Sequence, residues 1–80
     1  MNILEKMQAK RIAQFRWLCV FGTEPAVYLH EEPPKSLNAN WMNEPKTWYP
    51  VCDRHHQWLH TLSREEAERV LKEAVDSFAY

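Results

Sequence analysis

The ten residues 51–60, V-C-D-R-H-H-Q-W-L-H, constrain the fold of this chain most strongly, because they bring one thiol and three imidazoles together. Cysteines and histidines at such short spacing are typical zinc ligands. A chain of 80 residues can build only one small core, and such domains often depend on a metal, a disulfide or a partner subunit for stability. We therefore expect one domain, residues 1–80, with a metal site in or near residues 51–60.

The first twenty residues do not form a signal peptide, because charged side chains interrupt their apolar positions. These charges are Glu5, Lys6, Lys10, Arg11 and Arg16. We therefore expect a cytoplasmic protein whose cysteines, Cys19 and Cys52, stay reduced and suit a metal better than a disulfide. No apolar run is long enough to span a bilayer, so we expect no membrane partner.

The net charge of −1 argues against both a strongly basic nucleic-acid-binding protein and a polyanionic mimic of DNA. Positive charge is nevertheless concentrated in residues 1–20, where Lys10 and Arg11 are adjacent. These two side chains could contact a partner, including the phosphates of a nucleic acid. Cations on a helix more often form only its solvated face.

Hydrophobic periodicity predicts an α+β domain. Residues 2–15 have helical spacing without Gly or Pro, whereas residues 16–21 and 26–29 are β-prone and flank a turn at Gly22 to Pro25. We therefore expect an N-terminal helix followed by a β-hairpin over residues 17–30. Residues 31–46 hold three prolines and three asparagines and predict a long loop, and residues 47–51 predict a short strand.

Two helices are expected after this strand. Asp53 can cap a helix over residues 54–62, and Ser63 with Glu66 forms a capping box that opens the last helix. The apolar stripe of the last helix consists of Ala67, Val70, Leu71, Ala74, Val75 and Phe78. We expect this stripe to pack on the core; a less favoured alternative is a homodimer formed through this C-terminal helix.

Helical geometry divides the candidate ligands into two pairs. His56 and His60 lie four residues apart, on one face of a helix, and can hold one divalent cation. Cys52 and His55 form a second chelating pair where the strand meets the helix. Because His55 and His56 leave the helix about 100° apart, the pairs indicate different sites.

The spacing C-x-x-H-H-x-x-x-H, which begins at Cys52, follows a strand, a turn, a strand and a long loop. This order resembles the HNH nucleases of phages and bacteria, which have the ββα-metal or treble-clef fold. Gly22, Pro25 and His30 also fall on positions of the family's opening motif. The resemblance covers about residues 18–60 and leaves residues 1–17 and 61–80 as flanking helices.

The chain also departs from the family's pattern. Leu18 and Phe21 stand where the family usually has its first pair of zinc cysteines, and Leu29 replaces a histidine ligand. Cys19 lies one residue out of register, which on a strand would point it to the opposite face.

The matching histidines imply nuclease chemistry. By this resemblance His30 would be the general base, and His56 and His60 would be ligands of a divalent ion that neutralises charge on the scissile phosphate.

We favour a non-catalytic interaction module on a degenerate HNH-like scaffold, because apolar residues replace several ligands. The small size and the helix at each end look similar to accessory proteins of phages and mobile elements, so the protein partner could be a host defence protein that the chain inhibits. Trp41, in the polar loop, is expected to be exposed for binding, whereas Trp17 and Trp58 are expected in the core.

Two alternatives stay open. The first is an active metal-dependent endonuclease or nickase that uses the three histidines of the resemblance. The second is a structural zinc protein in which Cys19, His30, Cys52 and His55 close one tetrahedral site, with a strand bulge that turns Cys19 inward. Both alternatives need Zn²⁺ or another divalent ion, whereas the interaction module needs none.

Overall fold

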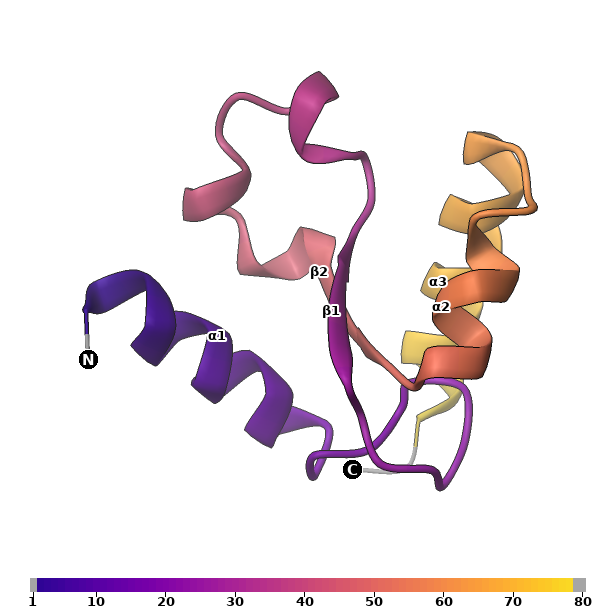
Figure 1. The fold of residues 1–80 in the computed structure, drawn as a ribbon, viewed down its shortest axis with the longest axis horizontal. Helices are drawn as coiled ribbons and strands as arrows, with labels where there is room; N and C mark the ends of the chain where they lie inside the picture. The colour runs from indigo at the N-terminus through magenta and orange to yellow at the C-terminus, as the bar shows by residue number, and fades with distance from the viewer. Residues whose placement is uncertain (1, 79–80) are drawn as a thin grey trace.

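The computed structural model describes residues 2–78 and has the predicted α+β composition. A helix and a two-stranded antiparallel sheet are followed by two helices (Figure 1). The elements are α1 Ile3–Gln14, β1 Tyr28–Glu31, β2 Trp48–Val51, α2 Asp53–Leu59 and α3 Arg64–Ser77. Three short 3-10 turns lie between the strands, at η1 Lys35–Leu37, η2 Trp41–Asn43 and η3 Pro45–Thr47.

The helix ends follow their capping residues. The Asn2 side chain accepts a hydrogen bond from the Glu5 amide at the start of α1, and Ser63 accepts one from the Glu66 amide at the start of α3, as the capping box predicts. The second helix begins one residue earlier than expected, because Cys52 rather than Asp53 is its N-cap. It also ends at Leu59, before the predicted end at residue 62.

The sheet differs from the predicted hairpin. Residues 17–30 were expected to pair with themselves, but β1 pairs with β2, and His30 lies opposite Tyr49. The earlier segment forms only an isolated bridge between Leu18 and Pro25. The reason lies at the end of α1, where Arg16 and Trp17 adopt left-handed φ values of 57° and 63° and turn the chain sharply, so an extended strand cannot begin there.

The long loop packs against the second strand. The Trp48 indole nitrogen donates a hydrogen bond of 2.8 Å to the Trp41 carbonyl, and the Lys35 ammonium lies 4.3 Å from the centre of the Trp41 ring. Trp41 is therefore partly buried under Lys35 rather than fully exposed as expected. Its backbone and ring both help to order residues 31–46.

Two other tryptophans are placed differently from the prediction. Trp17 and Trp58, which were expected in the core, have 58% and 39% of their surface exposed. Trp17 is part of the sharp turn that ends α1, where its side chain stays largely exposed. Trp48 is the fully buried tryptophan, with 1% exposure.

The core lies between the sheet and the helices. Its buried members include Phe15, Val51, Leu59 and Leu71, and in Figure 1 the first helix lies on one side of the strands and the last two on the other. The α3 stripe packs on this core as expected: Ala67 and Leu71 are buried, and the other four positions are partly buried against the cluster. Within residues 2–78, no helix is both long and apolar enough to cross a bilayer.

Replacing Leu71 tests the packing of α3. Its side chain is 0% exposed, so Leu71→Ala removes buried methyl groups and leaves a cavity. We expect the free energy of unfolding in urea to fall by about 2–5 kcal/mol. Arg69→Ala, an exposed position on the same helix, should change it by less than about 0.5 kcal/mol. An equally small effect of Leu71→Ala would contradict the proposed packing.

Candidate metal centres

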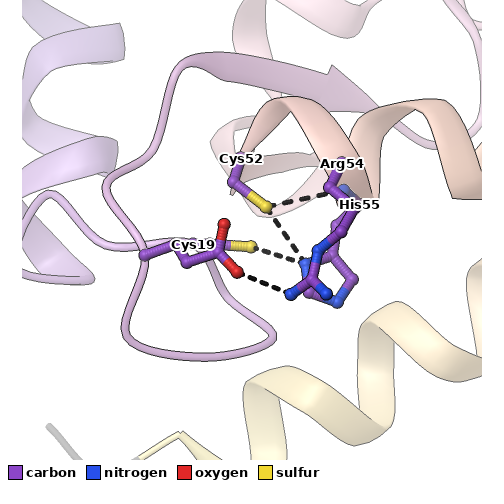
Figure 2. A network of polar contacts seen from close by, with 5 residues as sticks. Cys19, Cys52, Arg54 and His55 are labelled. Atoms are coloured by element: carbon purple, nitrogen blue, oxygen red, sulfur yellow. Dashed lines mark hydrogen bonds and ion pairs between the residues drawn. The ribbon is translucent and has the colours of Figure 1, made fainter.

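Three side chains form the first candidate centre, which we call the cysteine cluster: Cys19, Cys52 and His55. The two sulfur atoms approach the same imidazole nitrogen, His55 Nδ1, at 3.6 Å from Cys19 and 3.1 Å from Cys52 (Figure 2). A tetrahedral zinc ion would place sulfur and nitrogen ligands about 3.6 Å apart. The donor types and their separations therefore fit one zinc ion.

Local structure explains this convergence. Cys52 ends the strand segment and caps α2, where its sulfur accepts a hydrogen bond from the His55 amide at 3.5 Å. Cys19 arrives from the turn after α1, held by a backbone hydrogen bond of 2.7 Å to Glu24. An ion pair between Glu24 and Arg54 joins that turn to α2.

The expectation that Cys19 faces away from the other ligands is wrong. Residues 16–21 are not a regular strand, so the alternation of faces on which that expectation depended does not apply. Cys19 is instead 0% exposed and faces Cys52 and His55. Phe21, which stands at a ligand position of the HNH pattern, stacks on the His55 ring with 4.8 Å between ring centres.

Burial also affects the pKa of a thiol in this cluster. It raises the pKa of the Cys19 thiol, and backbone hydrogen bonds from Cys52 and Phe21 lower that pKa in part. The free thiol therefore keeps its proton at neutral pH. Binding of a metal, which needs the thiolate, would release this proton.

The second candidate centre is the histidine cluster, made of His30 on β1 and His56 and His60 on and just after α2. The Nε2 atoms of His56 and His60 lie 3.2 Å apart, close to the roughly 3.3 Å expected between two nitrogen ligands of tetrahedral zinc. The His30 ring centre is 5.7 Å from that of His56 and 5.6 Å from that of His60. Three imidazoles thus converge on a space that one cation could fill.

Glu32 contacts His30 of the histidine cluster, and it was not among the site residues predicted from the sequence. Its Oε1 lies 3.1 Å from His30 Nε2, and both residues are more than nine-tenths buried. With the carboxylate as acceptor, Nε2 donates this hydrogen bond, and Nδ1 is the His30 nitrogen left for another partner. The sequence does contain a signal for this contact. Glu32 lies two residues after His30, which places both side chains on the same side of an extended chain.

The histidine cluster opens to solvent, unlike the cysteine cluster. His60 is exposed and His56 is partly buried, with the Tyr28 ring stacked on it at 4.5 Å. Both line a hollow of about 430 Å³ whose wall also carries two cations and two carboxylates: Lys35, Arg64, Glu31 and Glu32. A ligand could therefore reach this cluster from outside.

His56 is suited to bind a metal at neutral pH. Partial burial lowers its pKa, and the neighbouring His60 and His30 lower it further, whereas Asp53 acts in the opposite direction. The neutral form of imidazole is the form that ligates metals.

The prediction of two separate pairs is consistent with this geometry, since adjacent His55 and His56 belong to different clusters. The four-ligand alternative is not assembled, because His30 lies with the other two histidines and Cys19 joins Cys52 without it. A three-ligand cysteine cluster replaces that expectation. A β-bulge is not needed to turn Cys19 inward, because no strand forms there.

The residues proposed to bind a partner are dispersed. Lys10 is exposed, whereas the Arg11 Nε atom donates a hydrogen bond of 2.9 Å to the Trp48 carbonyl and its guanidinium lies 4.8 Å from the Phe15 ring centre. Arg11 therefore holds α1 against β2.

Comparisons with known proteins add no further constraint: no family model, curated protein or solved structure matches this chain.

Removing the Glu32 carboxylate should weaken metal binding at the histidine cluster. Glu32→Leu leaves His30 without its acceptor, so we expect the Co²⁺ dissociation constant measured by absorption titration to rise about 10–100-fold. Glu31→Leu is the matched control, since Glu31 contacts Lys35 and not a histidine. An unchanged dissociation constant in Glu32→Leu would remove Glu32 from the site.

The metal-free protein should lose stability in acid through His56. Its folded-state pKa lies below the unfolded value of about 6.5, so the unfolded chain binds more protons as pH falls through this value. The free energy of unfolding of chelator-treated protein should therefore be lower at pH 5.5 than at pH 7.5. His56→Gln should reduce this difference, and an identical pH dependence in the variant would assign it to other groups.

Proposed function

We propose that this chain is a metal-dependent hydrolase of phosphodiester bonds with an HNH-like, treble-clef centre. In this proposal the cysteine cluster is a structural zinc site and the histidine cluster is the catalytic site. The observation that carries it is the convergence of His30, His56 and His60 beside an open hollow whose wall includes Lys35 and Arg64.

The burial of the two clusters supports this division of roles. Cys19 and Cys52 are at most 3% exposed, so an ion held between them would be shielded from substrate. The histidine cluster offers three protein ligands and access from solvent, which is the usual arrangement of catalytic zinc sites.

The same geometry supports the nuclease alternative over a degenerate scaffold. The degenerate interpretation depended on three apolar residues at ligand positions: Leu18, Phe21 and Leu29. His30 lies near enough to His56 and His60 to supply a third imidazole. The cysteine pair of the family's opening motif is absent, but Cys19 gives the structural cluster a second sulfur.

Each side chain has a distinct task in the proposed reaction. His56 and His60 would hold the ion through Nε2, and Glu32 would orient His30 so that its Nδ1 could bind the ion or accept a proton from water. Lys35 and Arg64 would hold the anionic oxygens of the substrate. A divalent ion bound here supplies Lewis-acid stabilisation of the phosphate and an activated water.

Plasmid nicking tests this proposal. Supercoiled plasmid is incubated with the purified protein and Mg²⁺, Mn²⁺ or Zn²⁺, and we expect His60→Ala to lower the nicking rate by about two orders of magnitude. Gln57→Ala, an exposed position on the same helix, should keep the wild-type rate. Absence of nicking with every ion, or full activity in His60→Ala, would contradict catalysis at this cluster.

A second candidate function is protein binding, such as inhibition of a host defence protein by a phage-type accessory protein. The observation that favours it is exposed aromatic surface: Trp58 lines an apolar groove of about 670 Å³, which Phe21 and Phe78 also line. A protein partner recovered in stoichiometric amount from bacterial lysate and lost with Trp58→Ser would support it. Recovery of nucleic acid without such a partner would count against it.

A further inference from the structure

A third hollow, of about 410 Å³, lies between α1, β2 and α3. Its walls are formed by Arg11, Lys46, Tyr49, Lys72, Val75 and Asp76. Three cations and one carboxylate line it, so its surface carries an excess of positive charge. We call it the anion hollow.

Tyr49 provides a polar atom that the described fold leaves unused. Its side chain is 6% exposed, and its hydroxyl makes no hydrogen bond with any residue between 2 and 78. No buried side-chain oxygen of the described residues lacks a partner, so this hydroxyl is the accessible end of a largely buried side chain that lines the hollow. In the anion hollow this hydroxyl is therefore a ready donor to a ligand.

The cationic side chains of the hollow come from three elements: α1, η3 and α3. The Arg11 guanidinium lies 6.0 Å from the Tyr49 ring centre and is positioned by its bond to the Trp48 carbonyl. Lys72 is held 2.8 Å from Glu68 on α3, and Lys46 on η3 forms no ion pair with a described residue. Burial raises the pKa of Tyr49. The charges of Arg11 and Lys72 lower this pKa, and those of Glu68 and Glu32 raise it.

We propose that the anion hollow binds a phosphate group, with Tyr49 as hydrogen-bond donor and Lys46 and Lys72 as its charged partners. Phosphate fits this set better than a carboxylate, because its several anionic oxygens can accept bonds from donors on different sides. The group could belong to a small phosphorylated molecule or to the backbone of a nucleic acid.

This site is separate from the proposed catalytic site. His30 and Tyr49 are paired across the sheet, but the histidine cluster involves β1 and α2, whereas the anion hollow is formed by α1, η3, β2 and α3. The proposal therefore does not depend on metal binding or hydrolysis, and His60→Ala should leave it intact.

The first experiment titrates inorganic phosphate into the isotope-labelled full-length protein at constant ionic strength, with amide chemical shifts as the readout. We expect saturable shifts at Lys46, Tyr49 and Lys72 in both wild type and His60→Ala. Lys46→Gln and Tyr49→Phe should each raise the dissociation constant about tenfold. Lys10→Gln, which removes an exposed charge outside the hollow, should not change it.

Three results would overturn the proposal. The first is no saturable shift at these amides, and the second is an equal weakening in Lys10→Gln, which would mean general charge attraction. Loss of the shifts in His60→Ala would also overturn it, because phosphate would then be reporting on the histidine cluster. A short DNA oligonucleotide that binds more tightly than phosphate, and is weakened by Lys46→Gln, would identify the source as nucleic acid. Binding of phosphate but no tighter binding of DNA would identify a small ligand.

Discussion

The backbone pairing of β1 with β2 determines where most of the candidate ligands lie. His30 is on β1, and β2 leads directly into Cys52 and α2, which carries the other histidines. Because the register places His30 opposite Tyr49, a shift of one residue would turn His30 to the other face of the sheet. The four paired positions of a short sheet thus hold together residues about 25 apart in the chain.

Because the chain is small, the polar contacts around this sheet contribute much to the positions of its elements. Arg11 joins α1 to the Trp48 carbonyl, Trp48 joins the long loop through Trp41, and Arg54 joins α2 to the turn at Glu24. Each contact connects an element to the region of the ligands rather than to a distant part of the core. An 80-residue chain has few buried side chains to spare, so such contacts do much of the positioning.

Sequence periodicity was sufficient to predict the helices, and residue types with their spacing were sufficient to predict the candidate ligands. The capping box at Ser63 and the apolar stripe of α3 depend on neighbours within one or two turns, and both are present as expected. The spacing of His56 and His60 likewise needed only helical geometry. These are local properties, so a single sequence contains the information.

Long-range features could not be predicted in the same way. The partner of β1 lies across a long loop, and the left-handed residues Arg16 and Trp17 gave no signal such as a glycine. The burial of Cys19 beside Cys52 followed from that unseen turn, and so did the exposure of Trp17. Glu32 was missed because its role depends on a burial that only the folded chain creates.

The seven-residue helix α2 lies between the clusters and has candidate ligands of both: His55 belongs to one and His56 to the other. A helix this short is only marginally stable alone. An ion bound at one end would restrain the helix, so a second ion at the other end would cost less conformational entropy. Occupation of the two sites is then thermodynamically linked. By reciprocity, the factor by which an ion at one cluster changes affinity at the other is the same in both directions.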